Sequence, residues 1–184
     1  LGSATLGANP SQAQVAQWLA TLAPDAVHDS TTRFVYDKLN RLQYSLDALG
    51  AVTGFEYDAA GNVLQSTRYA RAVNLPAGTV SADDLAGALQ YAFDNRTTRY
   101  EYDALHRLST TRQPDGLTIV NEYDAVGNLT AVRRGEGSDL SHYRLERHVF
   151  DAANHLRFSV DAEGYVSESL YDGLGKLISR VQYA

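Results

Sequence analysis

The stretch Glu56-Tyr57-Asp58-Ala59-Ala60-Gly61-Asn62-Val63-Leu64 decides the fold, because five similar stretches recur along the chain. Each copy contains an aromatic–aspartate pair, and the six pairs are Tyr36-Asp37, Tyr57-Asp58, Tyr102-Asp103, Tyr123-Asp124, Phe150-Asp151 and Tyr171-Asp172. Subtracting the positions of successive aromatics gives separations of 21, 45, 21, 27 and 21 residues. A separation that returns three times predicts a repeat protein, in which one supersecondary unit packs against copies of itself and insertions lengthen two of the intervals.

A turn follows each aromatic–aspartate pair. Four residues after the aromatic, the chain carries only Gly, Asn or His, namely Asn40, Gly61, His106, Gly127, Asn154 and Gly175. Glycine and asparagine tolerate a positive φ best, so this column predicts a left-handed residue in a tight turn. The aspartate of each copy is expected to accept a hydrogen bond from the backbone N–H two residues on, as in an Asx turn.

Strands are predicted on both sides of each turn. Six residues after the aromatic, every copy has an aliphatic residue preceded by a polar one, and these aliphatic residues are Leu42, Val63, Leu108, Leu129, Leu156 and Leu177. Such alternation is typical of a half-buried strand. Further reversal signals occur midway between pairs, at Asp47-Ala48-Leu49-Gly50, Pro114-Asp115-Gly116 and Asp161-Ala162-Glu163-Gly164. The pattern predicts a mainly β protein, an antiparallel β-hairpin repeat strip or curved shell, with two short helical insertions.

The helices are expected at two places. Ser11 can cap a helix reaching Leu22 and ending before Pro24, with Val15, Trp18, Leu19 and Leu22 on one apolar face. Ser81 can cap a second helix, with Leu85, Ala88, Leu89 and Ala92 on its face. We therefore divide the chain into a loop and short helix over 1–31 and a β domain over 32–184, with a helical insertion at about 71–96. A smaller insertion, about 135–143, is predicted to be a lengthened hairpin loop.

Two longer segments also repeat. Thr31-Thr32-Arg33-Phe34-Val35-Tyr36-Asp37 matches Thr97-Thr98-Arg99-Tyr100-Glu101-Tyr102-Asp103, 66 residues further on. The last residues, Arg180-Val181-Gln182-Tyr183-Ala184, are similar to Ser66-Thr67-Arg68-Tyr69-Ala70, where the helical insertion begins. A larger module of one helix followed by two aromatic–aspartate units is thus predicted.

The composition narrows the classes of protein to which this chain can belong. The net charge of −6 argues against nucleic acid as a partner, because phosphate binding requires a basic surface. The chain has no Cys, which removes disulfides and thiolate metal ligands, and it has no apolar run of the roughly 20 residues that a membrane helix needs. It also has no Met, so we expect a segment of a longer protein.

The copies Tyr57-Asp58-Ala59-Ala60-Gly61-Asn62-Val63-Leu64 and Tyr123-Asp124-Ala125-Val126-Gly127-Asn128-Leu129-Thr130 resemble the YD repeats of Rhs proteins, toxin-complex cocoons, bacterial wall-associated proteins and teneurins. The resemblance covers about residues 33–184. It implies a β-strand shell around a hollow, in a secreted or cell-surface protein. It also implies neighbouring repeats of the same longer chain as partners, with an encapsulated toxin domain as a further one.

Catalysis and metal binding are weighed against this structural interpretation. A calcium loop needs several oxygen ligands at alternating positions, whereas each turn offers one carboxylate. The five histidines show no spacing typical of a zinc site, and no serine stands in a nucleophile motif. We therefore predict no catalytic residue, no metal and no cofactor.

The tyrosines leave one alternative open. The column of repeated tyrosines is expected to stack from one repeat to the next, because strand aromatics ordinarily pack across strands. Exposed aromatics can instead contact sugar rings. Tyr143 and Tyr165 lie outside the column and are the candidates for glycan contact. The favoured function is a non-enzymatic scaffold, and the alternative is an adhesin that binds carbohydrate or a cell-surface partner.

Overall fold

The structure, a computed structural model, describes residues 9–22, 30–75, 78–89, 94–137 and 139–183. The chain falls into two compact units, Leu1–Thr32 and Arg33–Ala184. Three expectations lie outside the described residues: the first eight residues of the N-terminal loop, the helix stop at Pro24 and the contribution of Ala92 to the second helix.

The first unit contains helix α1 (Gln12–Leu19). The Ser11 hydroxyl accepts a hydrogen bond from the Gln14 N–H at 3.3 Å, and the Ser11 N–H donates to the Gln14 side chain at 2.8 Å. This reciprocal pair is a capping box, and it satisfies two N–H groups that a helix start leaves without intrahelical partners. The helix ends three residues earlier than expected, with Ala20 as its C-cap, and none of its residues is buried.

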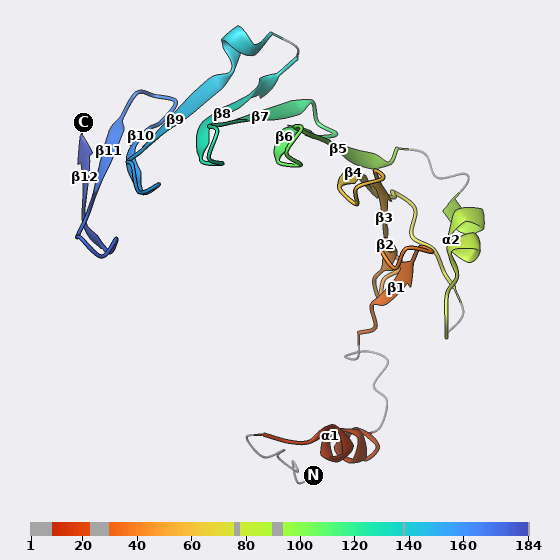
Figure 1. Ribbon diagram of the computed structural model, residues 1–184. Helices are drawn as coiled ribbons and strands as arrows, with labels where there is room; N and C mark the ends of the chain where they lie inside the picture. Colours follow the sequence, from red (N-terminus) through yellow and green to blue (C-terminus); the bar gives the residue numbers. More distant parts are fainter. Residues whose placement is uncertain (1–8, 23–29, 76–77, 90–93, 138, 184) are drawn as a thin grey trace. The chain divides into compact units, whose positions relative to one another are not determined.

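The second unit is built on one antiparallel sheet of twelve strands, and each strand pairs with its neighbours in the sequence (Figure 1). The strands are β1 (Arg33–Tyr36), β2 (Leu42–Leu46), β3 (Val52–Tyr57), β4 (Val63–Arg68), β5 (Arg96–Tyr102), β6 (Leu108–Arg112), β7 (Leu117–Tyr123), β8 (Leu129–Glu136), β9 (Arg144–Phe150), β10 (Leu156–Val160), β11 (Val166–Tyr171) and β12 (Leu177–Tyr183). The sheet does not close, since β1 and β12 are its two end strands. The predicted mainly β hairpin strip is confirmed.

The aromatic–aspartate turns occupy one end of the strands. Each aromatic is the last residue of an odd-numbered strand, so all six turns lie at the same end of the strands. We call this row of strand ends the YD edge. The register of each of these hairpins shifts just before the aromatic, which places it opposite the aliphatic residue six positions later, as Tyr57 opposes Val63. This one-residue irregularity is a β-bulge, and it increases the local strand twist.

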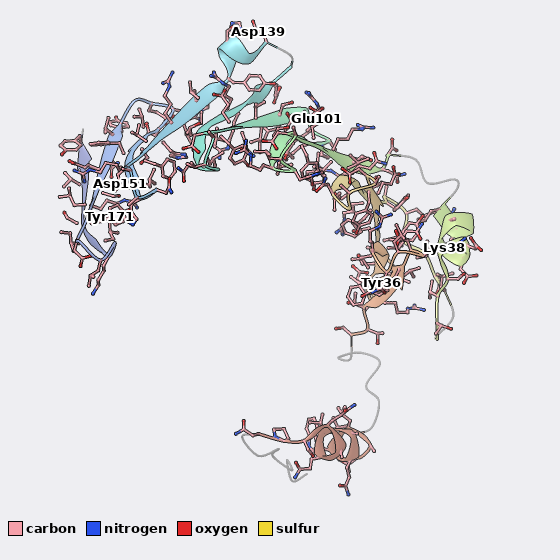
Figure 2. All side chains as sticks on the ribbon, in the orientation of Figure 1. Tyr36, Lys38, Glu101, Asp139, Asp151 and Tyr171 are labelled. Carbon is pink, nitrogen blue, oxygen red and sulfur yellow. The ribbon has the colours of Figure 1, made fainter. Side chains whose placement is uncertain are left out.

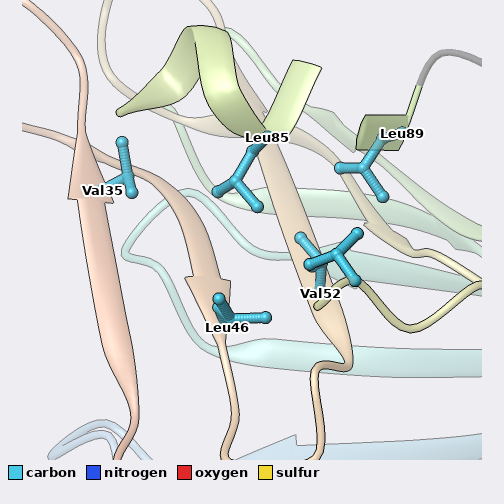
Figure 3. Packing of buried hydrophobic residues seen from close by; sticks show 6 residues of the cluster. Val35, Leu46, Val52, Leu85 and Leu89 are labelled. Carbon is cyan, nitrogen blue, oxygen red and sulfur yellow. The ribbon is translucent and has the colours of Figure 1, made fainter. Parts of the chain in front are cut away.

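A small core lies where the helical insertion packs on the first strands. Helix α2 (Ala82–Leu89) begins after Ser81, whose hydroxyl accepts a hydrogen bond from the Asp84 N–H. Its Leu85, which is 0% exposed, packs with Leu89 against the side chains of Leu46 and Val52, which are 1% and 0% exposed (Figure 3). The cluster also contains Val35 and Val73.

The smaller insertion differs from the loop that the sequence predicts. Strand β8 runs to Glu136, and a single 3-10 turn, η1 (Leu140–His142), precedes β9. The Asp139 carboxylate accepts a hydrogen bond from the Ser141 N–H at the start of this turn. Sequence periodicity misses such an element, because three residues are too few to show a helical repeat.

Candidate functional site: the aspartate turns and their links

The six YD turns share one backbone geometry. In each turn the aspartate N–H donates to the carbonyl four residues on, and the N–H three residues on donates back to the aspartate carbonyl. In the second turn these distances are 3.0 Å from Asp58 N to Asn62 O and 3.2 Å from Gly61 N to Asp58 O. The turn is therefore closed by two backbone hydrogen bonds before any side chain contributes.

The left-handed residue predicted in each turn is confirmed. The φ angles are 59° at Asn40, 94° at Gly61, 60° at His106, 101° at Gly127, 63° at Asn154 and 77° at Gly175. Non-glycine residues are strained in this region, with asparagine and histidine among the better tolerated. The left-handed conformation at this position of the turn could thus be predicted from the residue types alone.

Each aspartate holds its turn through one carboxylate oxygen. Oδ1 accepts hydrogen bonds from the N–H groups two and four residues on, at 2.8 to 3.1 Å, in all six turns. The predicted Asx turn is therefore present, together with a second donor that the sequence did not indicate. The same arrangement at Asp47 and Asp161 closes two hairpins at the opposite edge of the sheet.

The second carboxylate oxygen binds the side chain four residues on. Asp58 Oδ2 accepts from the Asn62 amide at 2.8 Å, and Asp37 Oδ2 accepts from Arg41 Nε at 2.8 Å. Asp103, Asp124 and Asp151 are bound in the same way by Arg107, Asn128 and His155.

These hydrogen bonds keep the carboxylates ionised. The Asn62 amide is the largest cause that lowers the pKa of Asp58, whereas the backbone N–H of Arg41 is the largest cause that lowers the pKa of Asp37. The pKa values of Asp103, Asp124 and Asp151 are lowered by the equivalent groups. A general acid needs a raised pKa, so these five carboxylates suit structural acceptance of hydrogen bonds rather than proton donation.

The tyrosines join one repeat to the next through their hydroxyl groups. Tyr57 Oη donates to the Leu42 carbonyl at 2.7 Å, and Tyr123 Oη donates to the Leu108 carbonyl at 3.0 Å. Tyr102 and Tyr171 donate to the equivalent carbonyls of Val63 and Leu156. Each acceptor belongs to the aliphatic position of the preceding repeat.

The expected stacking of tyrosine on tyrosine is wrong. The Arg41 guanidinium lies 4.6 Å from the centre of the Tyr57 ring, and Arg107 lies 4.5 Å from that of Tyr123. Among the described residues, the recorded ring pair is His155 on Tyr171, at 4.7 Å. In three of the turns a long side chain, Arg41, Arg107 or His155, therefore lies against the tyrosine ring of the next repeat. Figure 2 shows Tyr171 beside the turn of Asp151.

The sequence reasoning treated the position five residues after the aromatic only as polar, but it carries the links between turns. Arg41 Nη1 donates to the Asp58 carbonyl at 3.0 Å, and Asn62 in turn contacts His106 Nδ1 at 2.9 Å. Arg107 and Asn128 repeat this pair of links, to Asp124 and to Asn154. The alternation of long Arg or His with Asn or Lys along this column was a signal that could have revealed these links.

The copy with phenylalanine has a substitute donor. Phe150 lacks a hydroxyl, and the Leu129 carbonyl that a tyrosine would bind instead lies 3.1 Å from His148 Nδ1. The contact requires the proton on Nδ1, because a carbonyl only accepts. His148 lies two residues before the aromatic, and Asn121 at the same place before Tyr123 also donates to the shared acceptor, Leu108 O, at 3.0 Å.

The two glycan candidates have different surroundings. Tyr143 is 7% exposed and its hydroxyl donates to the Gly137 carbonyl, so its ring is not available for stacking on a sugar. A Cβ atom at Gly135 would overlap the Tyr143 ring, which shows how closely the ring covers this glycine. Tyr143 therefore presents little ring surface for the glycan contact that the sequence suggested. Tyr165 is 50% exposed.

The described residues also form clefts. One is lined by His155, Arg157 and Tyr171 at the YD edge, where Arg157 donates to Glu168 at 2.9 Å. Among the described residues, no group of three or more His, Asp or Glu side chains could hold a metal ion. No helix in the same part of the chain is both long and apolar enough to cross a membrane.

Comparisons with known proteins give the same repeat family. The model of the RHS Repeat matches residues 36–80 and 89–118. No curated protein matches the sequence.

Similar folds occur in solved structures of toxin complexes. The crystal structure of TcdB2-TccC3-Cdc42 is similar at 17% identity and a TM-score of 0.63, and that of the Photorhabdus luminescens Tc holotoxin pore at 18% and 0.63. Each similarity covers 83% of this chain but 8% of the other, so this chain spans less than a tenth of those proteins. The repeated aspartate turns, the match to the RHS Repeat model over part of the chain and the shared fold together support the resemblance of this chain to YD/RHS-repeat proteins.

Proposed function

We propose that this chain is a wall segment of a large shell-forming protein, and that its role is structural and not catalytic. The observation that carries the proposal is the use made of the repeated residues. The aspartate closes its own turn, the tyrosine hydroxyl binds the preceding repeat, and the side chain after the left-handed residue reaches a neighbouring turn. The repeated residues of each turn thus close the turn and connect each repeat to its neighbour.

The carboxylates support the same proposal. Five of them have a lowered pKa and accept hydrogen bonds through both oxygens. A carboxylate with its lone pairs occupied by its own turn is poorly placed to act on a bound substrate, because catalysis requires a group aimed at the reacting atom.

The parent shell, in this proposal, is secreted and encloses a toxin polypeptide. Support comes from the similar folds in Tc toxin structures and from the RHS repeats themselves. A longer chain of such hairpins would extend the wall by the same hydrogen bonds, since each repeat contacts only its neighbours.

Imaging the full-length natural protein by electron microscopy tests this proposal. We expect a hollow particle whose wall contains residues 33–183, and an enclosed segment that resists added protease. A variant with Gly61→Val and Gly127→Val should lose that protection, whereas Gly61→Asn and Gly127→Asn should keep it, because asparagine tolerates positive φ. A separate, exposed domain formed by these residues would contradict the proposal.

A second candidate, adhesion through carbohydrate, has one observation in its favour. The Tyr165 ring is 50% exposed at the edge opposite the YD turns. A glycan array tests it, with Tyr165→Ala as the informative variant and Tyr36→Ala, at a 55% exposed tyrosine, as the matched control. Binding that Tyr165→Ala alone abolishes would support adhesion, and the absence of any binding would exclude it for the glycans displayed.

A further inference from the structure

Two arginines stand directly opposite each other on the internal strand pair β4–β5. Arg68 and Arg96 are partners in the register of this pair, and both side chains are exposed. Directly opposite residues of an antiparallel pair have Cβ atoms about 5 Å apart on one face of the sheet, so like charges there repel each other. Just beyond them, the Ala70 N–H donates to the Asn95 side chain at 3.1 Å. This hydrogen bond holds the two strand ends together and keeps the arginines side by side.

The chain does not neutralise this pair. Within the part of the chain that the structure describes, neither Arg68 nor Arg96 forms an ion pair or a side-chain hydrogen bond. A guanidinium group remains charged at every physiological pH. The repulsion between the two groups therefore costs stability, and an anionic partner would remove that cost.

The strand pair β8–β9 contains a second copy of the arrangement. Subtracting the positions of the aromatics gives an offset of 66 residues from β4 to β8 (57 to 123) and of 48 residues from β5 to β9 (102 to 150). These offsets carry Arg68 to Arg134 and Arg96 to Arg144, which are again directly opposite each other. The two arginine pairs are therefore equivalent in strand, register and face.

In the second copy, the chain supplies a carboxylate to each arginine. Arg134 Nη1 donates to Glu146 Oε1 at 2.5 Å, and the Arg144 guanidinium pairs with the Glu163 carboxylate. Glu146 comes from β9, and Glu163 comes from the turn between β10 and β11. The second copy thus shows which chemical group satisfies such an arginine pair.

The first copy lacks both of these glutamates. Thr98 stands at the position of Glu146, and it carries a hydroxyl group in place of the carboxylate. Asp115 stands at the position of Glu163 and is one methylene shorter. The Asp115 carboxylate accepts a hydrogen bond from the Leu117 N–H of its own turn at 3.2 Å. The two copies therefore differ in their acids and not in their arginines.

The neighbours of the first pair are polar as well. Three hydroxyl-bearing residues lie beside the arginines on the same face of the sheet, and they are Thr53, Ser66 and Thr98. In the second copy, the positions of the first two carry Ile119 and Val132. A hydroxyl group can donate to lone pairs of a bound carboxylate that the arginines leave unfilled. The first copy is therefore suited to an anion that comes from elsewhere.

We infer that Arg68 and Arg96 form a binding site for carboxylate side chains of an acidic segment in a partner polypeptide. A carboxylate accepts two parallel N–H···O bonds from a guanidinium group, so the pairing has direction as well as charge. The site lies on the face opposite helix α2, because Val52 packs beneath α2 and the next residue, Thr53, opposes Arg68. The helical insertion therefore leaves the site accessible.

Fluorescence anisotropy of a labelled tetraglutamate peptide, titrated with the whole chain, tests the inference. We expect saturable, salt-sensitive binding that Arg68→Gln and Arg96→Gln each weaken at least about fivefold, because each removes a charge-assisted partner. Arg99→Gln is the matched control, since Arg99 is an exposed arginine on the same strand but on the opposite face. This variant should bind the peptide as the unmodified chain does, and a labelled tetraglutamine peptide should not bind.

Exchanging the acids between the two copies tests the comparison itself. Thr98→Glu should supply the carboxylate that Glu146 supplies in the second copy, so peptide binding should be lost although both arginines remain. The opposite change, Glu146→Thr together with Glu163→Asp, should create a second peptide site on β8–β9.

Thermal unfolding without peptide gives a readout that does not depend on the ligand. Arg96→Gln should raise the melting temperature, because it removes the repulsion across β4–β5, and high salt should reduce the increase. Arg144→Gln should give no such increase, because its arginine is paired with Glu163.

Competition distinguishes the sources of the anion. Tetraglutamate should displace the labelled peptide at lower concentration than sodium sulfate or heparin does. Stronger competition by either of these would overturn the inference in favour of a small oxyanion or an acidic polysaccharide. No peptide binding, or an equal loss in Arg99→Gln and Arg68→Gln, would also overturn it.

Discussion

Strands β1–β4, which we call module 1, and strands β9–β12, which we call module 3, have the same strand pairing and apolar residues at the same positions. Among the described residues, only module 1 has a helix that covers these positions. In module 1 the leucine and valine of the central strands are almost completely buried beneath α2, whereas Val149 of module 3 is half exposed. The difference shows that the sheet is a single layer that cannot bury its own face. The turns hold the strands together along the YD edge, and burial depends on what each insertion supplies.

The largest predicted effect removes the cover itself. Leu85→Ala should lower the free energy of unfolding by about 2–5 kcal/mol, because Leu85 is fully buried and its loss leaves a cavity between α2 and the sheet. Urea unfolding followed by circular dichroism measures this. The control Leu174→Ala, at a side chain that is 95% exposed, should change stability by less than about 0.5 kcal/mol. Equal losses would mean that α2 contributes no core.

A matched pair of valines compares the two modules directly. Val52→Ala in module 1 should cost about 2 kcal/mol, since Val52 is 0% exposed. Val166→Ala, at the corresponding position of module 3, should cost less than half of that in the monomeric chain, because its side chain is only partly buried. The same urea measurement applies. A larger loss at Val166 would contradict the account of an uncovered face.

The turns should respond alike in both modules. Gly61→Val should cost about 1–3 kcal/mol, because a β-branched residue is strained at a φ of 94°. Gly61→Asn is the control and should cost less, since Asn40 and Asn154 adopt the same conformation. Thermal unfolding of both variants is the test, and similar melting losses would show that strain at this residue does not limit the turn.

The smallest predicted effect concerns pH. The folded pKa of Asp58 and of Asp124 is lowered, so their contribution to stability is complete above the unfolded pKa of about 4 and is lost as the pH falls through the folded pKa. The variant with Asp58→Asn and Asp124→Asn should be less stable at pH 7 and should lose less stability between pH 5 and pH 3. Urea midpoints across that range measure it, and parallel pH profiles for variant and unmodified chain would contradict the assignment.

The sequence was informative where one residue type determines local geometry. The column from Asn40 to Gly175 predicted the left-handed turns, and each aspartate predicted an Asx turn, because both depend on residues within one turn. The strands and their sequential pairing followed from the repeat and the short connections.

The missed features depend on contacts between repeats. The Arg41 contact with Tyr57 spans sixteen positions, and Tyr143, which precedes β9, packs on Gly135 of β8. Neither contact can be predicted from one repeat alone, and the signal for the Arg41 contact was the alternation of residue types along the column five residues after the aromatic. The open face of module 3 could have been found from sequence by comparing equivalent positions, but its meaning required knowing that α2 covers the first copy.

Hydrogen exchange measured by mass spectrometry on the dilute, monomeric chain tests the central claim most directly. The account predicts that amides of β2 and β3, beneath α2, exchange more slowly than those of β10 and β11, and that Leu85→Ala removes most of the difference. Equal protection of the two pairs of strands, or slower exchange in β10 and β11, would contradict it.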